Sequence, residues 1–172
     1  MRIIKFLLKL LAVLLILFLL SGVLFPKVKY TTTQQVDLPL EATFDLYTDA
    51  TRMKHWYTGL QSIRTEEQKP GVVGNKYKMV TEDIKGDFMQ LKRIVTKYKK
   101  PQQINYSTQS IGMIREESII FQDVGGQTLI TNKASTAGKS YFLKCLYASF
   151  FWVLKNEDQA ILDSFKTYAE RK

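Results

Sequence analysis

The chain has 172 residues, a formal net charge of +9, one cysteine and one histidine. More than half of the excess charge comes from five basic residues before position 30, and the remainder is scattered without a nucleic-acid recognition motif. No nucleic-acid partner is therefore expected, and a single cysteine excludes both an intrachain disulfide and a thiolate metal cluster.

The N-terminal segment 3–25 is apolar apart from two lysines, a serine and a glycine. A helix that spans a bilayer needs ~20 mostly apolar residues. A cleaved signal peptide starts in the same way, but this segment ends in bulky residues instead of the small residues of a cleavage site. We expect an uncleaved signal anchor within residues 1–29. Because basic residues are more numerous before the segment than after it, the N-terminus is predicted to be cytoplasmic and the domain, residues 30–172, extracytoplasmic.

The first elements of the domain follow without a linker. The stretch "KYTTTQQVDL" is rich in β-branched residues and predicts a strand. In "LPLEATFDLY" the residues Leu40, Phe44 and Tyr47 have helical spacing and follow a proline, which predicts a short helix. A second short helix is expected from Asp49 to Trp56.

The period then changes to two, which is typical of strands. Five strands are predicted, at "NKYKMVTED", "FMQLKRIVTKY", "QINYSTQ", "REESIIFQD" and "QTLITNKAST". The pair Gly125 and Gly126 between the last two predicts a hairpin turn with positive φ. After Gly138 the chain is predicted to be helical to its end, with an apolar stripe formed by Ile161, Leu162, Phe165 and Tyr168. Asn156, with Gln159 three residues on, indicates either the cap of a fresh helix start or a kink.

This order of elements resembles the START-related superfamily, also called the polyketide cyclase/dehydrase-like or SRPBCC group, whose α+β architecture is the helix-grip fold. The resemblance rests on "VDLPLEATFDLYTDATRMKHWYTGLQSI", "PGVVGNKYKM" and "LDSFKTYAER", and it covers residues 30–172. It implies a curved antiparallel sheet wrapped around a long C-terminal helix, with two short helices after the first strand. In this chain an N-terminal transmembrane helix would precede that domain.

In such folds a cavity between the sheet and the last helix commonly holds an apolar ligand. The alternation of the strands in this chain also directs one apolar face inward. Packed interiors are the rule, so periodicity leaves open whether that face lines a hollow. The residues predicted to bind the ligand are Trp56, Tyr77, Met79, Leu91, Arg93, Tyr106, Ile119, Phe121, Phe142 and Phe150, with His55 and Tyr57 at the rim.

Three charged residues, Arg93, Arg115 and Glu117, share the inward side of the predicted strands. A charge that points inward needs a partner. One interpretation is that they lie near strand ends, or that a bulge shifts the register, so that they reach water. The other is that Arg93 binds the anionic head of an apolar ligand while Arg115 and Glu117 neutralise each other.

His55 is a rim residue in this interpretation. General-base catalysis would need an oriented partner and a substrate proton, and no motif supplies either, so no catalytic residue is predicted. The superfamily includes cyclases and dehydratases, so an enzyme that acts on an apolar substrate remains an alternative. No metal or nucleotide cofactor is expected.

The segment Tyr141–Leu154, "YFLKCLYASFFWVL", is apolar nearly all round and carries one charge, Lys144. Such helices are usually buried, and this one is too short for a second membrane crossing. An alternative is an interaction protein that uses this helix at the membrane. The main prediction is a monomer, anchored through residues 3–25, that binds a hydrophobic small molecule or lipid near the bilayer.

Overall fold

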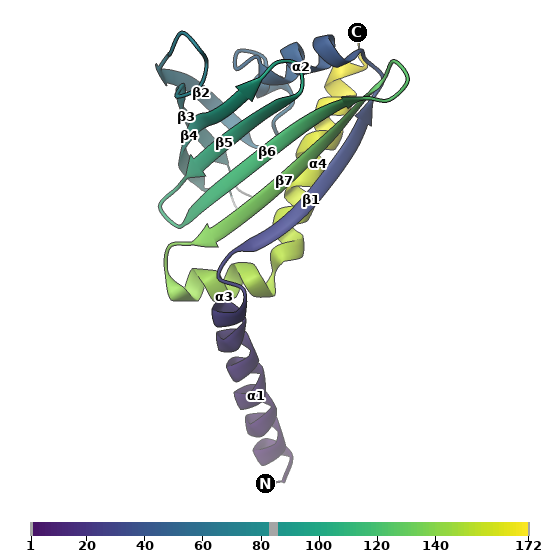
Figure 1. Ribbon diagram of the computed structural model, residues 1–172. Coiled ribbons are helices and arrows are strands. Elements are labelled where there is room, and N and C mark those ends of the chain that lie inside the picture. Colours follow the sequence, from purple (N-terminus) through teal and green to yellow (C-terminus); the bar gives the residue numbers. More distant parts are fainter. Residues whose placement is uncertain (1, 83–85, 172) are drawn as a thin grey trace.

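A strongly curved antiparallel sheet forms most of the domain in the computed structural model (Figure 1), which describes residues 2–82 and 86–171. Its strands are β1 (Val28–Val36), β2 (Leu60–Glu67), β3 (Lys76–Glu82), β4 (Phe88–Lys99), β5 (Gln103–Gln109), β6 (Met113–Asp123) and β7 (Thr128–Gly138). Their order in the sheet is β1-β7-β6-β5-β4-β3-β2, so only β1 and β7 are paired without being chain neighbours.

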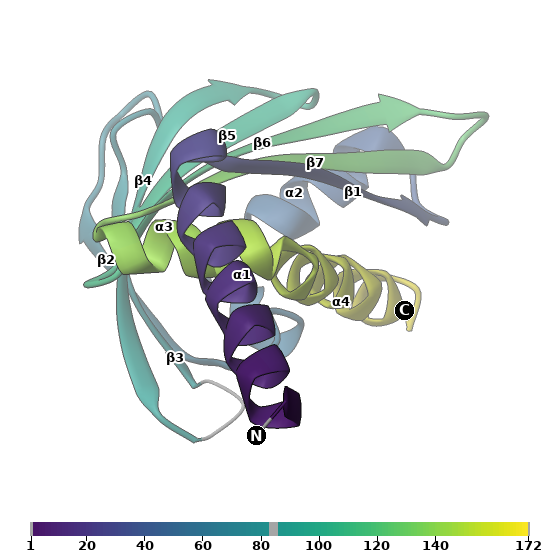
Figure 2. The ribbon, with the colours of Figure 1, turned by 90° about the horizontal axis from the view of Figure 1, so that it is seen from below.

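The helices are α1 (Arg2–Leu24), α2 (Leu40–Thr48), the 3-10 turn η1 (Met53–His55), α3 (Tyr141–Ser149) and α4 (Phe151–Ala169). Seen from below, the sheet curves around α4, which lies in its concave side (Figure 2). The α+β class and the helix-grip architecture expected from the sequence are confirmed.

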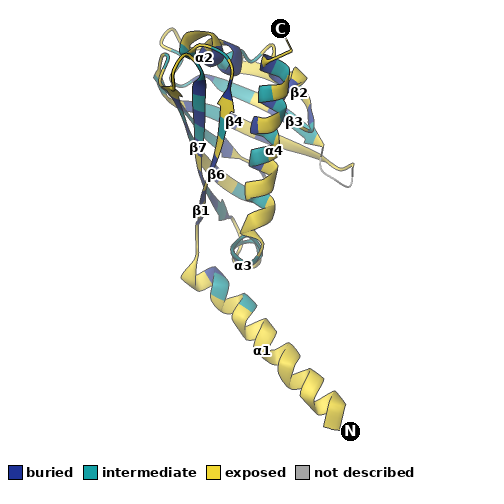
Figure 3. Cartoon of the chain, turned by 90° about the vertical axis from the view of Figure 1, so that its right-hand side faces the viewer, coloured by how far each residue is buried: buried dark blue, intermediate teal, exposed yellow. Residues whose placement is uncertain are grey.

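The main core lies between α2, α4 and the concave side of the sheet. The apolar stripe predicted on the last helix is buried there through Leu162 and Phe165, and Phe44 and Tyr47 of α2 are buried against them. In Figure 3 the sheet-facing side of α4 is dark, whereas α1 is exposed along most of its length. The core therefore belongs to the domain alone, and α1 adds nothing to it.

Strand β2 was not predicted. Its sequence, "LQSIRTEE", is mostly polar, so the second strand was predicted at "NKYKMVTED" instead. The structure explains the weak signal, because β2 is an edge strand of the sheet. Edge strands carry charged residues that discourage pairing with other molecules, so their apolar alternation is poor.

The prediction of one continuous final helix is wrong. The helix breaks at Phe150, whose backbone has φ −127° and ψ 33°, and Asn156, the predicted cap or kink, lies inside the unbroken α4. Helix α3 crosses beneath the end of the sheet, and α4 turns away along the concave side (Figure 1). No proline or glycine lies at the break. The two helices pack on different surfaces, α3 on α1 and β7 and α4 on β1, and this accounts for the change of direction.

Two smaller expectations concern the ends of elements. Gly125 and Gly126 have positive φ values of 71° and 89°, which confirms the predicted turn chemistry. Strand β1 begins at Val28, two residues before the expected start of the domain, and Val28 is paired with Thr136. Helix α1 has 23 residues, and an 18-residue stretch of it has a mean hydropathy of 2.9; among the described helices, it is the one long and apolar enough to cross a membrane.

Candidate functional site

A cleft of about 260 Å³ lies between the inner face of the sheet and the first half of α4. We call it the grip cleft. Its apolar wall includes Met89 and Leu91 of β4, Met113 of β6 and Ile161 of α4. The other residues that line it are Tyr57, Thr58, Gly59, Thr81, Glu82, Arg115, Glu157, Asp158 and Ala160. The cleft thus combines an apolar wall with a group of charged side chains at its base.

That charged group is part of a buried ion-pair network. Glu117 lies 3.0 Å from a guanidinium nitrogen of Arg93 and 3.4 Å from one of Arg115. Arg115 also pairs with Asp158, which α4 contributes. All four side chains are at least nine-tenths buried. A buried carboxylate or guanidinium needs such partners, because leaving one unpaired is costly.

The register of the strands assembles this network from distant parts of the sequence. One row across the sheet pairs Arg93 with Thr108 and Thr108 with Arg115. The next row pairs Tyr106 with Glu117. Because alternate residues of a strand share a face, both rows project inward, and Arg93 Nε donates to Thr108 Oγ1 at 3.1 Å. The network is therefore a direct product of strand alternation.

The four charges balance when all are ionised, two positive against two negative. Burial raises the pKa of Glu117, but Arg115, Arg93 and the Thr108 hydrogen bond outweigh burial and place the pKa below its usual 4.5. Burial raises the pKa of Asp158, and Arg115 offsets this only in part. The network of these four residues is thus neutral when all are ionised, and Glu117 is the carboxylate whose ionised form it favours.

Comparison with known proteins assigns the chain to a family. The model of the family described as Activator of Hsp90 ATPase homolog 1-like protein matches residues 37–144, more than half of the chain. The chain belongs to this family. No curated protein matches it in sequence. Members of this family share the helix-grip fold, so the START-related resemblance seen in the sequence is confirmed.

Solved structures similar to this family member show the same fold at low sequence identity. The Zhui aromatase/cyclase from Streptomyces has a TM-score of 0.71 and 12% identity, over 84% of this chain and 94% of that one. The di-domain aromatase/cyclase BexL has a TM-score of 0.70 and 18% identity, over 84% of this chain and 50% of that one. Ara h 8.0201 has a TM-score of 0.69 and 12% identity, over 85% of this chain and 99% of that one.

Four of the ten predicted ligand residues of this family member lie in its packed core and line neither the grip cleft nor the smaller cavity next to it. Trp56, Met79, Ile119 and Phe121 are almost completely buried among other core side chains. Trp56 does not face a cavity, because its ring packs on Tyr47 and Phe165 with centroids 4.8 and 4.9 Å away. Of the predicted ligand residues, Leu91 lines the cleft.

Three further predicted residues, Tyr77, Arg93 and Tyr106, line a second, smaller cavity of about 170 Å³. Arg93 lies over the rings of Tyr106 and Tyr57, 4.8 and 5.4 Å from their centroids. Tyr57 lines the grip cleft and its hydroxyl is 3.4 Å from Arg93, so this contact separates the two spaces. Since Arg93 is already paired with Glu117, the hypothesis that it binds an anionic ligand head is not supported.

Phe142 and Phe150 lie at the opposite end of the domain from the predicted site. Both are largely exposed, on α3 and at the break between α3 and α4. The structure therefore does not place these two predicted ligand residues at the grip cleft. The helix break places Phe150 outside the concave side of the sheet.

His55 is exposed, and its ring stacks on Tyr168 at a centroid distance of 5.9 Å. Within the described residues, no side-chain hydrogen bond or ion pair holds the imidazole, and no group of three potential metal ligands forms a cluster. His55 does not line the grip cleft, whereas its predicted companion Tyr57 does.

Asp158 is the functional residue that sequence reasoning missed. It shares the buried stripe of α4 with Leu162, Phe165 and Ala169, at positions separated by three or four residues. An acid on the apolar side of a helix needs a basic partner for the same reason as the inward residues of the strands. Applying that rule to the helix would have identified Asp158 as the partner of an inward arginine.

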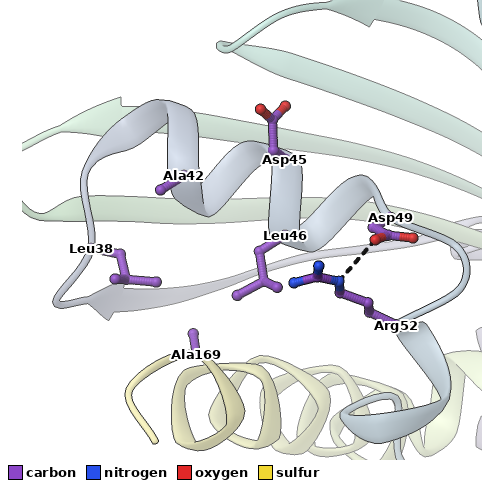
Figure 4. A pocket seen from close by; sticks show the side chains of 7 residues that line it. All are labelled: Leu38, Ala42, Asp45, Leu46, Asp49, Arg52 and Ala169. Carbon is purple, nitrogen blue, oxygen red and sulfur yellow. Dashed lines mark ion pairs between the residues drawn. The ribbon is translucent and has the colours of Figure 1, made fainter. Parts of the chain in front are cut away.

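A third hollow, of about 290 Å³, lies between α2 and the end of α4 (Figure 4). Leu38, Leu46 and Ala169 point into it, and Asp49 pairs with Arg52 at 3.0 Å on its other side. Asp45, the remaining charged residue that lines it, pairs with Lys100. The charged side chains of this hollow pair at the surface, whereas those at the base of the grip cleft are buried, so the grip cleft is the better candidate site.

The lowered pKa of Glu117 predicts a specific pH dependence. Between its folded pKa and the usual 4.5, the unfolded chain takes up a proton that the folded chain does not, so stability falls as the pH falls. The difference in unfolding free energy between the wild type and Glu117→Gln should therefore shrink as the pH drops below 4.5. Urea unfolding of the detergent-solubilised protein at several pH values measures this difference, and a constant difference would contradict the prediction.

Proposed function

We propose that this protein binds an apolar small molecule in the grip cleft while α1 anchors it in a membrane. The observation that carries the proposal is the cleft itself, whose apolar wall of Met89, Leu91, Met113 and Ile161 ends at a polar base. Ligand pockets are typically apolar with a few convergent polar groups that orient the ligand. At about 260 Å³ the cleft suits a small ligand or one part of a longer molecule.

The chemistry of the base favours a neutral polar group on that ligand. Among the described residues, the Nε atom of Arg115 is buried without a hydrogen-bond partner, while one terminal nitrogen, Nη2, pairs with both Glu117 and Asp158. A carbonyl or hydroxyl oxygen of a ligand would satisfy this donor. An additional anion would disturb a network whose charges already balance, and burying an unbalanced charge is unfavourable.

The anchoring part of the proposal rests on α1. A helix of 23 residues is roughly 34 Å long, which is enough for the hydrocarbon core of a bilayer. Its last turn also packs on the domain, because Gly22 is buried where an added Cβ would lie 2.5 Å from the sulfur of Cys145. The Ser21 hydroxyl lies 3.1 Å from that of Ser149. Such fitted contacts favour a retained anchor over a cleaved signal peptide. The larger number of basic residues before the apolar segment favours an N-terminus in the cytoplasm and a domain outside.

A matched pair of variants on β4 tests ligand binding. Met89 lines the cleft, whereas its neighbour Gln90 is exposed on the other face of the strand. We expect native mass spectrometry of the protein released from detergent to show a bound apolar molecule in the wild type and in Gln90→Trp. Met89→Trp should lose it, because the indole fills the cleft. A wild type without bound mass, or equal retention by both variants, would contradict the proposal.

A further inference from the structure

Five exposed aromatic side chains lie on α3 and at the break that follows it, two in the first turn of α3 and three from Phe150 to Trp152. They are Tyr141, Phe142, Phe150, Phe151 and Trp152, each between 43% and 62% exposed, and we call them the aromatic corner. Large apolar side chains gathered on a surface usually mark an interaction site. The binding of a ligand in the grip cleft does not explain them, because none of the five lines that cleft.

The aromatic corner is next to the end of α1. Helix α3 lies between α1 and the sheet, as Figures 1 and 3 show. Towards α1, the ring of Phe142 is 5.8 Å from that of Phe18, and the Tyr141 hydroxyl donates to the carbonyl of Leu19 at 2.5 Å. Towards the sheet, Leu143 of α3 is in close contact with Gly138. The side of α3 that carries Tyr141 and Phe142 therefore faces the anchor.

The second part of the corner reaches the connector after α1. Phe151 and Phe25 line one apolar hollow of about 230 Å³, together with Lys27 and Lys29. Trp152 packs edge-on against Phe150 and Phe151, with centroids 5.4 and 5.8 Å away. Aromatic residues from the break and from the end of the anchor thus form one continuous surface.

The charges around this surface have one sign. From Lys139 to Lys155 the sequence contains three lysines and no acidic residue, and Lys27 and Lys29 follow the anchor. Tyrosine and tryptophan favour the boundary between lipid headgroups and acyl chains. Helices that lie in this boundary combine an aromatic and aliphatic face with lysines that attract anionic lipids.

We infer that the aromatic corner docks onto the surface of the bilayer that α1 spans, with its rings among the acyl chains and its lysines at anionic headgroups. This inference rests on the anchoring part of the proposed function. It adds that the domain is held against the lipid by a second surface and is not merely tethered. The occupant is a lipid bilayer, because the surface is continuous with the anchor and the charged residues around it are all basic.

Fluorescence of the full chain in vesicles tests this inference. The described chain contains two tryptophans, of which Trp56 is buried in the core and Trp152 belongs to the corner. The vesicles contain phosphatidylcholine and phosphatidylglycerol with brominated acyl chains, which quench only an indole that reaches them. We expect bromination to quench the wild type and to have no effect on Trp152→Phe, whose remaining emission comes from Trp56.

The outcomes separate docking from anchoring. Emission that bromination leaves unchanged would overturn the inference, whether aqueous iodide quenches Trp152, as for a surface in water, or fails to, as for one covered by protein. Alkaline carbonate washing of membranes tests α1 separately. Protein that resists the wash but is not quenched would retain the anchor and refute docking, whereas protein that is extracted but still quenched in vesicles would refute the anchor and support docking.

Discussion

Replacing Glu117 with glutamine is expected to lower the free energy of unfolding by about 3–5 kcal/mol, the usual cost of removing one partner from a buried ion pair. The variant leaves Arg93 and Arg115 buried with Asp158 as the one remaining carboxylate of the network. Guanidinium unfolding of the detergent-solubilised protein, followed by tryptophan fluorescence, measures the change.

The neighbouring Glu116 provides the control for this substitution. It lies on the exposed face of the same strand, where its carboxylate accepts a hydrogen bond from Ser107 at 2.7 Å. Glu116→Gln should change the stability by less than about 0.5 kcal/mol, as most surface substitutions do. Equal effects of the two substitutions would show that the network does not hold the sheet and α4 together.

Replacing Phe121 with alanine is expected to cost about 3–5 kcal/mol, because the lost transfer free energy is joined by a new cavity. Phe121 is 2% exposed, and its ring packs edge-on against Phe44 and Tyr47 with centroids 5.1 and 5.4 Å away. Phe121 lines none of the hollows described above, so no preformed space beside it reduces the cost.

Phe150→Ala is the matched variant, with the same change of side chain at an exposed position. It should cost less than about 1 kcal/mol, because little burial is lost. Thermal unfolding of both variants in the same detergent provides the comparison. A loss below about 2 kcal/mol for Phe121→Ala, which falls short of the solid-core range, would indicate that the interior near α2 is loosely packed.

The fold was largely predictable because strand alternation and helical stripes are local properties of the sequence. The inward positions of Arg93, Arg115 and Glu117 follow from parity alone. Their pairing with Asp158 does not, because it depends on how closely α4 approaches the sheet. Strand β2 escaped detection because an edge strand needs little apolar alternation.

The candidate site was less predictable than the fold. Periodicity identifies which residues point inward, but it contains no information about which inward residues meet a partner and which face a void. Ile119 and Phe121 are thus packed in the core, while Met113 and Ile161, neither of which was predicted to bind the ligand, line the grip cleft. Periodicity also did not predict the helix break at Phe150, because the break depends on tertiary packing. This break leaves the predicted ligand residues Phe142 and Phe150 exposed.

The connector between α1 and β1 restricts where this protein can meet its ligand. Three residues separate Leu24 from Val28, and a chain of that length reaches roughly 10 Å even when fully extended. With α1 in the bilayer, the domain cannot leave the membrane surface to carry cargo through the aqueous phase to a distant acceptor. Under the proposed function, the ligand would then be exchanged with molecules that arrive by lateral diffusion or from the adjoining water layer, so the protein would act as a stationary receptor and not as a shuttle.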